Sequence, residues 1–266
     1  GGRVDRGTHA PTGAFVAVKT ISVESREKRE QMLHEFTGLI RAAGCPYVVQ
    51  WYAGYVDRFT GFVKVVMEYM DMGSLAALSE RLNGSGLPWD HTTCVASQVV
   101  RGLQHLQSRT MLHRDVKPQN VLHARNGNVK LADFGISKEI QSSLGVLQTF
   151  KGTALYMSPE RASGHDYSYG SDIWSAGMVT LELATGKHPF PTRNFIDLWS
   201  ALVQDPEPRL DPAEHPEGLC DFVARCLTRD PSARPDAQEL MEHEVVRALS
   251  SEGVASFGRF VAELSP

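Results

Sequence analysis

Hydrophobic positions in the first part of the chain follow the two-residue period of β-strands. Residues 14–21 are rich in β-branched side chains, and two further apolar runs, 48–56 and 62–70, flank a turn-forming segment at 57–61. Residues 25–43 instead repeat apolar side chains at three- and four-residue spacing, which is typical of a helix with one buried face. The pattern predicts a small unit of three strands and one main helix.

From residue 75 onward the pattern becomes mainly helical. Residues 173–184 are apolar on nearly every side, follow Ser171 as a candidate N-cap and stop before Gly186, so we expect a helix in the middle of a second, larger unit. The pair Asn126-Gly127 lies between two short apolar pieces and predicts a tight two-residue hairpin turn. The expected fold is α+β with two lobes.

Composition narrows the class of protein without naming a function. Hydrophobic residues make up 42% of the 266 residues and charged residues 22%, which are ordinary globular values. Lys and Arg number 27 against 31 for Asp and Glu, and this slightly acidic balance argues against a nucleic-acid partner. The four cysteines show no C-x-x-C spacing, and no apolar run is long enough to span a bilayer. We therefore expect a reducing, cytoplasmic or nuclear setting.

The stretch 113–120, His-Arg-Asp-Val-Lys-Pro-Gln-Asn, carries the strongest chemical signal together with Asp133. A hairpin folds the chain back on itself, so Asn120 before it and Asp133 after it can converge on one point. Carboxylate and amide oxygens suit Mg²⁺, which gives both residues a predicted metal-binding role. Asp115 can accept a hydroxyl proton while Lys117 steadies a transferring phosphoryl group. The alternative interpretation treats all four as ordinary polar loop residues.

These motifs resemble the catalytic loop and the Asp-Phe-Gly triplet at 133–135 of eukaryotic protein kinases, and the resemblance covers nearly the whole chain. It implies a bilobal protein-kinase-like fold that binds ATP and Mg²⁺ between its lobes. The lobe boundary is expected near Met70, with residues 1–70 as the N-lobe and hinge and residues 71–266 as the C-lobe. Asp115 is then the residue that positions the substrate hydroxyl.

Several residues of the first 70 acquire nucleotide-binding roles from the same resemblance. Lys19, in the segment Val-Ala-Val-Lys, is similar to the lysine that contacts the α- and β-phosphates, with Glu35 on the helix as its partner. A solvated strand lysine and a helix-surface carboxylate are the alternatives. Gly2 and Val4 resemble the end of the glycine-rich loop, whose first glycine is absent, so we expect a longer natural protein. Ala17 joins the predicted nucleotide contacts.

Residues 65–70 resemble the hinge that binds the adenine. Met67 is expected to line the back of the pocket, and backbone groups of Glu68 and Met70 to hydrogen-bond the base. A buried strand with a methionine filler would have the same sequence pattern, so this interpretation depends on the resemblance.

The segment from Asp133 to Glu160 has little periodic pattern, which is uncommon in a compact domain unless the segment is functional. It resembles a protein-kinase activation segment. Its end, residues 152–160, is similar to the peptide-binding platform, with Glu160 paired to Arg234. Kinases of small molecules lack this platform, so a protein substrate is expected.

Ser143 and Thr149 are the candidate phosphorylation sites of this segment, with Ser142 beside them, and Arg114 offers a cation for a phosphate. Five residues separate Ser143 from Thr149, a spacing that resembles plant-type MAP kinase kinases. Such enzymes phosphorylate Thr and Tyr of a MAP kinase and are themselves activated by an upstream kinase. Unmodified loop hydroxyls are the alternative.

Asp172 is expected to hold the backbone of the catalytic loop, although an aspartate favoured by the helix dipole would look the same. The function expected overall is ATP-dependent phosphorylation of a MAP kinase. A sterile-type Ser/Thr kinase upstream in such a cascade and a catalytically weak scaffold pseudokinase stay open as alternatives.

Overall fold

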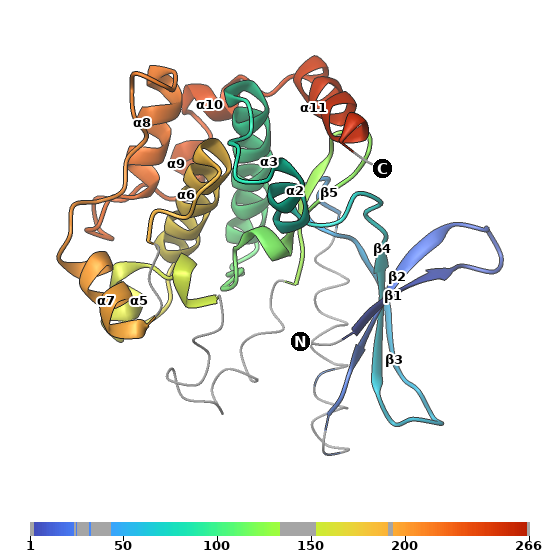
Figure 1. Cartoon of the computed structure of the whole chain (residues 1–266). Coiled ribbons are helices and arrows are strands. Elements are labelled where there is room, and N and C mark those ends of the chain that lie inside the picture. The colour runs from blue at the N-terminus through green and yellow to red at the C-terminus, as the bar shows by residue number, and fades with distance from the viewer. Residues whose placement is uncertain are drawn as a thin grey trace. The chain divides into compact units, whose positions relative to one another are not determined.

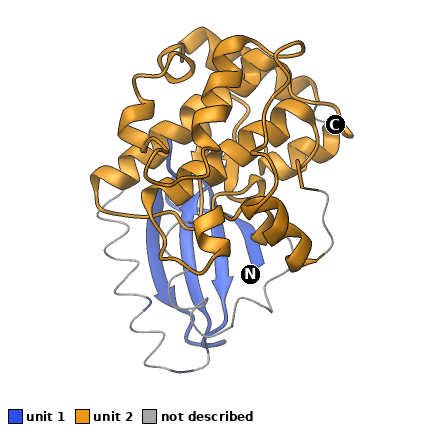
Figure 2. Ribbon diagram, turned by 90° about the vertical axis from the view of Figure 1, so that its left-hand side faces the viewer, with its two compact units in different colours: residues 1–71 blue, residues 72–266 orange. Residues whose placement is uncertain are grey.

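The computed structural model describes residues 3–23, 25, 32, 44–133, 153–190 and 194–264. The chain divides into two compact units, residues 1–71 and 72–266, shown in different colours in Figure 2. The division falls one residue beyond the lobe boundary expected at Met70.

Unit 1 is built on a four-stranded antiparallel sheet with the strand order β1-β2-β4-β3. The three predicted strands are present, and a fourth, β1, was not predicted. Charged residues and a glycine interrupt β1, and the burial alternates only weakly along this edge strand, so the usual apolar alternation is missing. The strand bounds are β1 Arg3–Thr8, β2 Phe15–Ile21, β3 Trp51–Val56 and β4 Val63–Glu68. The helix predicted over 25–43 lies outside the described residues, except Ser25 and the helical Met32.

Unit 2 is mainly helical and carries one small hairpin, as the pattern predicted (Figure 1). The long helices α3 and α6 pack against each other, and α8, α9, α10 and α11 contact one or both of them. The helix bounds are α2 Leu75–Leu82, α3 Trp89–Ser108, α5 Pro159–Ala162, α6 Tyr169–Thr185, α7 Phe195–Val203, α8 Glu217–Cys226, α9 Ala237–Leu240, α10 Glu244–Arg247 and α11 Ser251–Glu263, with short 3₁₀ helices at Pro118–Asn120 and Thr153–Tyr156.

Helix α6 is buried on nearly all sides and ends at Gly186 in the left-handed conformation, with φ of 72°, as expected. The predicted N-cap was wrong. Ser168 caps the helix, and Ser171 is the third helical residue, whose hydroxyl bonds back to the Ser168 amide. This reciprocal pairing satisfies two amide groups at the helix start, which explains why a second serine follows three residues after the cap.

The predicted hairpin forms between β5 (Val121–His123) and β6 (Val129–Leu131), but its turn differs from the two-residue type. The amide of Gly127 donates to the carbonyl of Ala124 at 2.9 Å, and the Ala124 amide donates to Asn128 at 2.9 Å. Gly127 has a φ of 87°, whereas the φ of Asn126 is not positive, as a two-residue type I′ turn would require. The loop therefore has three residues and closes with a left-handed glycine.

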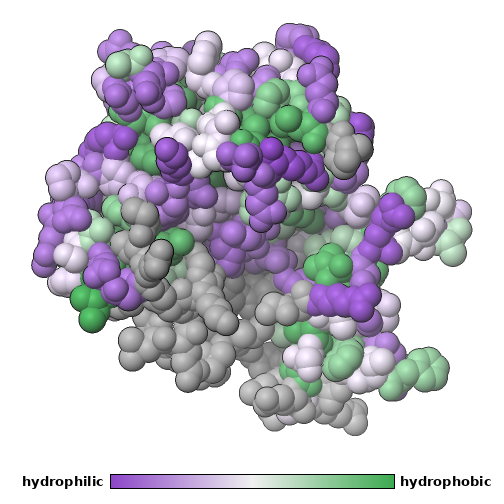
Figure 3. Space-filling view, in the orientation of Figure 1, coloured by the Kyte–Doolittle hydropathy of each residue, from purple (hydrophilic) through white to green (hydrophobic). Residues whose placement is uncertain are grey.

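The face of unit 2 that Figure 3 shows is mostly hydrophilic. In Figure 3, hydrophobic side chains form small patches among hydrophilic ones, and one such group lies over α7, where Ile196 is 77% exposed. Within the described part of the chain, no helix has both the length and the apolar character needed to cross a bilayer.

Candidate active site

The loop before the hairpin brings three predicted residues together. The ammonium of Lys117 lies 2.8 Å from Asp115 Oδ2, and Asn120 Nδ2 donates to the same oxygen at 2.7 Å and to the Asp115 carbonyl at 2.9 Å. The other carboxylate oxygen, Oδ1 of Asp115, is buried and has no hydrogen-bond partner among the described residues. A buried acceptor without a partner is costly, so this oxygen is available to a hydroxyl donor.

Asp172 holds the backbone of this loop from α6. Its Oδ2 accepts the amide of His113 at 2.8 Å and its Oδ1 accepts the amide of Arg114 at 2.9 Å. Arg114 has a φ of 69°, a left-handed conformation that a residue with a side chain rarely adopts. The two charge-assisted hydrogen bonds stabilise this strained backbone. The contact predicted for Asp172 is therefore present.

Burial governs the ionisation of the groups around Asp172. Burial raises the pKa of Asp172, although the hydrogen bonds from His113 and Arg114 oppose the rise. Burial lowers the pKa of His113 below 6.5, so its imidazole is neutral at pH 7 despite the carboxylates nearby. Tyr167 donates its hydroxyl to Asp172 at 3.1 Å, and burial beside that carboxylate raises the pKa of the phenol. Asp172 is thus a buried carboxylate whose hydrogen-bond donors, two backbone amides and one phenol, are neutral.

The hairpin joins Asn120 to Asp133, the two predicted metal ligands. The Ala132 amide donates to the Asn120 carbonyl at 2.8 Å, which continues the pairing of β5 and β6 by one step. Asp133 follows directly with a φ of 61°, a second strained residue in this region. The side-chain amide nitrogen of Asn120 donates twice to Asp115, so the side-chain oxygen of Asn120 is the atom suited to a hard cation.

Strand register collects the predicted nucleotide contacts of unit 1 on one face of its sheet. Val4 pairs with Lys19 across β1 and β2, and Ala17 pairs with Met67 across β2 and β4. Paired residues of antiparallel strands point to the same face, and Ala17 and Lys19 are two positions apart, so all four share that face. Ala17, Lys19 and Met67 are buried, whereas Val4 is 55% exposed.

The hydrogen bonds of Glu68 limit which of its backbone groups can contact a base. The Glu68 amide donates to the Gln50 carbonyl at 2.8 Å, and the Glu68 side chain accepts the Gln50 amide at 3.1 Å. Any backbone contact of Glu68 to a base therefore falls to its carbonyl oxygen. Met70 follows the end of β4 and is 7% exposed. The predicted residues Gly2, Glu35, Ser142, Ser143 and Thr149 lie outside the described residues.

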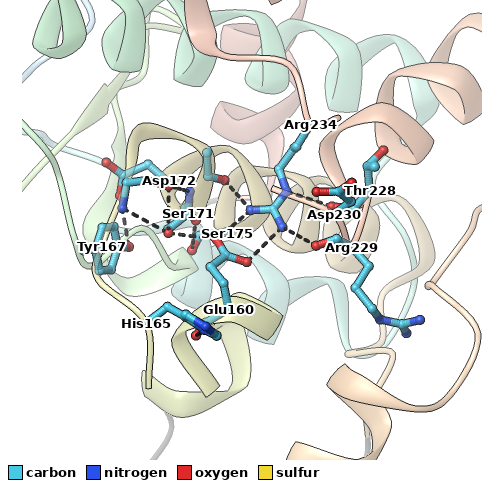
Figure 4. A network of polar contacts seen from close by, with 12 residues as sticks. Glu160, His165, Tyr167, Ser171, Asp172, Ser175, Thr228, Arg229, Asp230 and Arg234 are labelled. Carbon is cyan, nitrogen blue, oxygen red and sulfur yellow. Dashed lines mark hydrogen bonds and ion pairs between the residues drawn. The ribbon is translucent and has the colours of Figure 1, made fainter. Parts of the chain in front are cut away.

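Glu160 and Arg234 form the predicted ion pair, shown in Figure 4. Arg234 Nη1 and Nη2 donate to the two carboxylate oxygens at 2.8 and 3.0 Å, and Ser171 donates to Glu160 at 2.9 Å. The remaining guanidinium donors reach backbone carbonyls of Thr228, Gly170 and Arg229, so all five N–H groups are used. Burial of Glu160 raises its pKa, but Arg234 outweighs this effect and the pKa lies below its ordinary value.

Comparison with known proteins assigns this arrangement to a family. The sequence model of the protein kinase domain matches residues 1–246. The chain is 35% identical to mitogen-activated protein kinase kinase 2 of Arabidopsis thaliana, over 97% of this chain and 72% of that protein. It is 34% identical to the MAP kinase kinase skh1/pek1 of Schizosaccharomyces pombe, over 90% of this chain and 68% of that relative. The chain belongs to the MAP kinase kinase family of protein kinases.

Membership implies that this kinase uses ATP with a divalent metal ion. The described residues contain no cluster of three His, Cys, Asp or Glu side chains that could cage a metal by themselves. Asn120 and Asp133 instead supply an amide and a carboxylate oxygen, a donor set that fits a hard cation completing its coordination with water and phosphate oxygens. The residues present therefore fit the cofactor that the family implies.

One residue that supports the kinase's hairpin was not predicted from the sequence. Gln98, fully buried on α3, donates to the Gly127 carbonyl at 3.1 Å and accepts the Val129 amide at 2.9 Å. It therefore holds the turn and the first residue of β6. A polar residue within the apolar stripe of α3 was the available signal, but its partner, about 30 positions away along the chain, was not readable from local pattern.

Proposed function

We propose that this kinase transfers the γ-phosphoryl group of Mg²⁺-bound ATP to a Thr and a Tyr of a MAP kinase. The observation that carries the proposal is the half-buried contact of Asp115 with Lys117 and Asn120 in a chain whose relatives are MAP kinase kinases. A sterile-type Ser/Thr kinase and a scaffold pseudokinase are the outcomes against which the proposal is tested.

Asp115 is assigned the role of catalytic residue through its Oδ1 atom. That oxygen has no partner among the described residues, whereas Oδ2 contacts Lys117 and Asn120. A substrate hydroxyl can therefore donate to Oδ1, which orients it and accepts its proton as the phosphoryl group is transferred. Lys117, 2.8 Å from the same carboxylate, supplies positive charge next to the transferring group.

Asn120 and Asp133 are assigned to the metal. Mg²⁺ is the proposed ion because amide, carboxylate and phosphate oxygens are its preferred ligands. Bound there, it would neutralise charge on the phosphates. The chain's own part is to hold the two ligands at one end of a hairpin, which the Ala132 to Asn120 hydrogen bond does.

The sheet face of unit 1 is assigned to the nucleotide. Lys19 would contact the α- and β-phosphates with Glu35 as its partner, and Gly2 would cover the phosphates. Val4 and Ala17 are assigned to the adenine through their side chains. Glu68 is assigned to it through its backbone carbonyl and Met70 through its backbone amide. Met67 lines the back of the same pocket. The shared face of Val4, Ala17, Lys19 and Met67 supports this assignment.

Regulation is assigned to Ser143 and Thr149, which an upstream kinase would phosphorylate. Arg114, adjacent to Asp115, would engage one phosphate and order the segment that receives the substrate. This part of the proposal rests on sequence spacing, since both hydroxyls lie outside the described residues.

The test is a transfer assay with the Ser143→Asp, Thr149→Asp variant and a panel of inactive MAP kinases, reading phospho-Thr and phospho-Tyr separately. We expect dual labelling of at least one panel member, and loss of about 10²–10⁴-fold in rate when Asp115→Asn is added. Asp166→Asn, the same change at an exposed carboxylate, is the matched control and should leave the rate unchanged. Labelling of Ser/Thr peptides without Tyr would indicate the sterile-type alternative, and binding without transfer the scaffold.

A further inference from the structure

The C-terminal helix α11 lies in close contact with the turn of the catalytic hairpin, where Figure 1 shows it beside β5. A Cβ atom built on Gly258 would lie 2.8 Å from the Arg125 carbonyl oxygen and 2.9 Å from the Gly127 nitrogen. A Cβ on Gly127 would lie 1.8 Å from the Val254 carbonyl oxygen. Two glycines therefore permit a backbone-to-backbone approach that any other residue on either side would prevent.

An aromatic contact extends this packing onto β5. The ring of Phe257, fully buried on α11, has its centroid 5.9 Å from that of His123, the last residue of β5. His123 is itself fully buried, and its amide donates to the Gly73 carbonyl at 2.9 Å. The helix thus contacts the hairpin at its turn and along one strand.

The hairpin depends on such support because it is very short. Its ladder has three residue pairs, from Val121 with Leu131 to His123 with Val129, and an isolated two-stranded hairpin is only marginally stable in water. Gln98 of α3 holds one side of the turn, and α11 covers the glycine at its end. The opposite end, about 10 Å away at 3.3 Å per residue, carries Asn120 and Asp133.

We propose that Gly258 of α11 is a positioning residue for the metal ligands Asn120 and Asp133. By allowing the close approach to Gly127, it keeps the hairpin in the register that places both ligands. The match to the protein kinase domain ends at residue 246, before α11 begins. The proposed role of Gly258 therefore adds a structural requirement that lies outside the matched residues. The inference rests on the proposed roles of Asn120 and Asp133.

The test compares Gly258→Ala with Gly253→Ala in the full chain. Both substitutions replace a glycine of α11 by alanine, but a Cβ at Gly253 approaches only the Ser250 hydroxyl, at 3.3 Å. We expect Gly258→Ala to raise the Mg²⁺ concentration for half-maximal rate and to lower kcat, each by about 10- to 100-fold, as for other residues that orient metal ligands indirectly. KM for the protein substrate should be unchanged, and Gly253→Ala should behave as wild type.

A readout independent of activity is amide hydrogen exchange at Val129, whose amide donates to Gln98, and at Ala132, whose amide donates to the Asn120 carbonyl. Exchange should be faster in Gly258→Ala and unchanged in Gly253→Ala. Unchanged exchange together with unchanged Mg²⁺ dependence in a folded Gly258→Ala protein would overturn the inference.

If Gly258→Ala does not fold, Phe257→Leu takes its place as the test variant, and Phe260→Leu takes the place of Gly253→Ala as the control. Phe257 contacts both His91 and His123, whereas the ring of Phe260 contacts only His91 among the described aromatic residues. Faster exchange confined to Phe257→Leu supports the inference, and equal effects of the two overturn it. If Asp133→Asn leaves the Mg²⁺ dependence of the rate unchanged, the proposed function is contradicted instead, so the two failures are distinguishable.

Discussion

The sheet of unit 1 and the catalytic loop of unit 2 position their predicted functional residues by different means. In the sheet, strand register alone puts Val4, Ala17, Lys19 and Met67 on one face. In the loop, the backbone amides of His113 and Arg114, next to Asp115, are held by Asp172, nearly 60 positions further along the chain. Regular backbone pairing places side chains without dedicated partners, whereas a loop needs buried polar contacts to fix its shape.

This difference has consequences for stability. A buried charge is tolerated only while its partners are present, so removing one partner leaves a large penalty. A side chain on a sheet face can be exchanged with little effect on the backbone that carries it. Substitutions in the loop should therefore affect folding and activity together, and substitutions on the sheet face should affect ligand binding more than folding.

The largest effect is expected at Arg234. Arg234→Ala leaves the Glu160 carboxylate buried without its cation, and we expect a loss of about 3–5 kcal/mol in the free energy of unfolding. Arg225→Ala removes the exposed ion pair with Asp221 and should cost less than about 1 kcal/mol. Urea unfolding of both variants measures the difference. Equal losses would contradict the distinction between buried and surface contacts.

Asp172→Ala should have the next largest effect. It leaves the amides of His113 and Arg114 without their acceptor, a cost of about 1–3 kcal/mol for each buried group. Burial raises the pKa of Asp172, which shows that its charge is costly in the folded protein. Removing that buried charge offsets part of the cost, so we expect a net loss of about 2 kcal/mol in the free energy of unfolding. Chemical unfolding gives the number, and transfer activity should fall in the same variant. A stable, fully active variant would show that the loop holds its shape without Asp172.

On the sheet face, Lys19→Met should weaken nucleotide binding by about 1.5–3 kcal/mol, the value of a hydrogen bond to a charged group, with a much smaller change in stability. Lys64→Met is the matched control, because Lys64 pairs with Thr20 on the opposite face of the same sheet. Titration calorimetry with ATP and thermal melts separate binding from folding. Equal weakening by both variants would argue against a nucleotide face defined by register.

The smallest effect is the pH dependence of the Glu160 contact. The folded pKa of Glu160 lies below its ordinary value of 4.5, so its stabilisation is complete above that value and is lost as pH falls through the folded pKa. The stability difference between wild type and Glu160→Gln should be constant above about pH 5.5 and shrink below pH 4.5. Urea unfolding at a series of pH values measures it. A difference that grows on acidification would reverse the assigned sign.

Local pattern was enough to predict most of the fold. The apolar runs that became β2, β3 and β4 and the buried helix α6 were readable because period and burial agree along them. The edge strand β1 was missed because its exposed, charged residues do not alternate. The cap of α6 was misplaced because Ser168 and Ser171 are both good capping residues, and only the bonds between them show which one begins the helix.

The sequence by itself determined the chemistry: which side chains carry charge and metal-binding oxygens, and which family they resemble. The tertiary structure alone decided how those side chains are held. The hydrogen bonds of Asp172 to the loop, those of Gln98 to the hairpin and the close approach of Gly258 to the hairpin turn join segments far apart along the chain. Such contacts depend on the packing of helices around a common core, and periodicity within one segment carries no information about that packing.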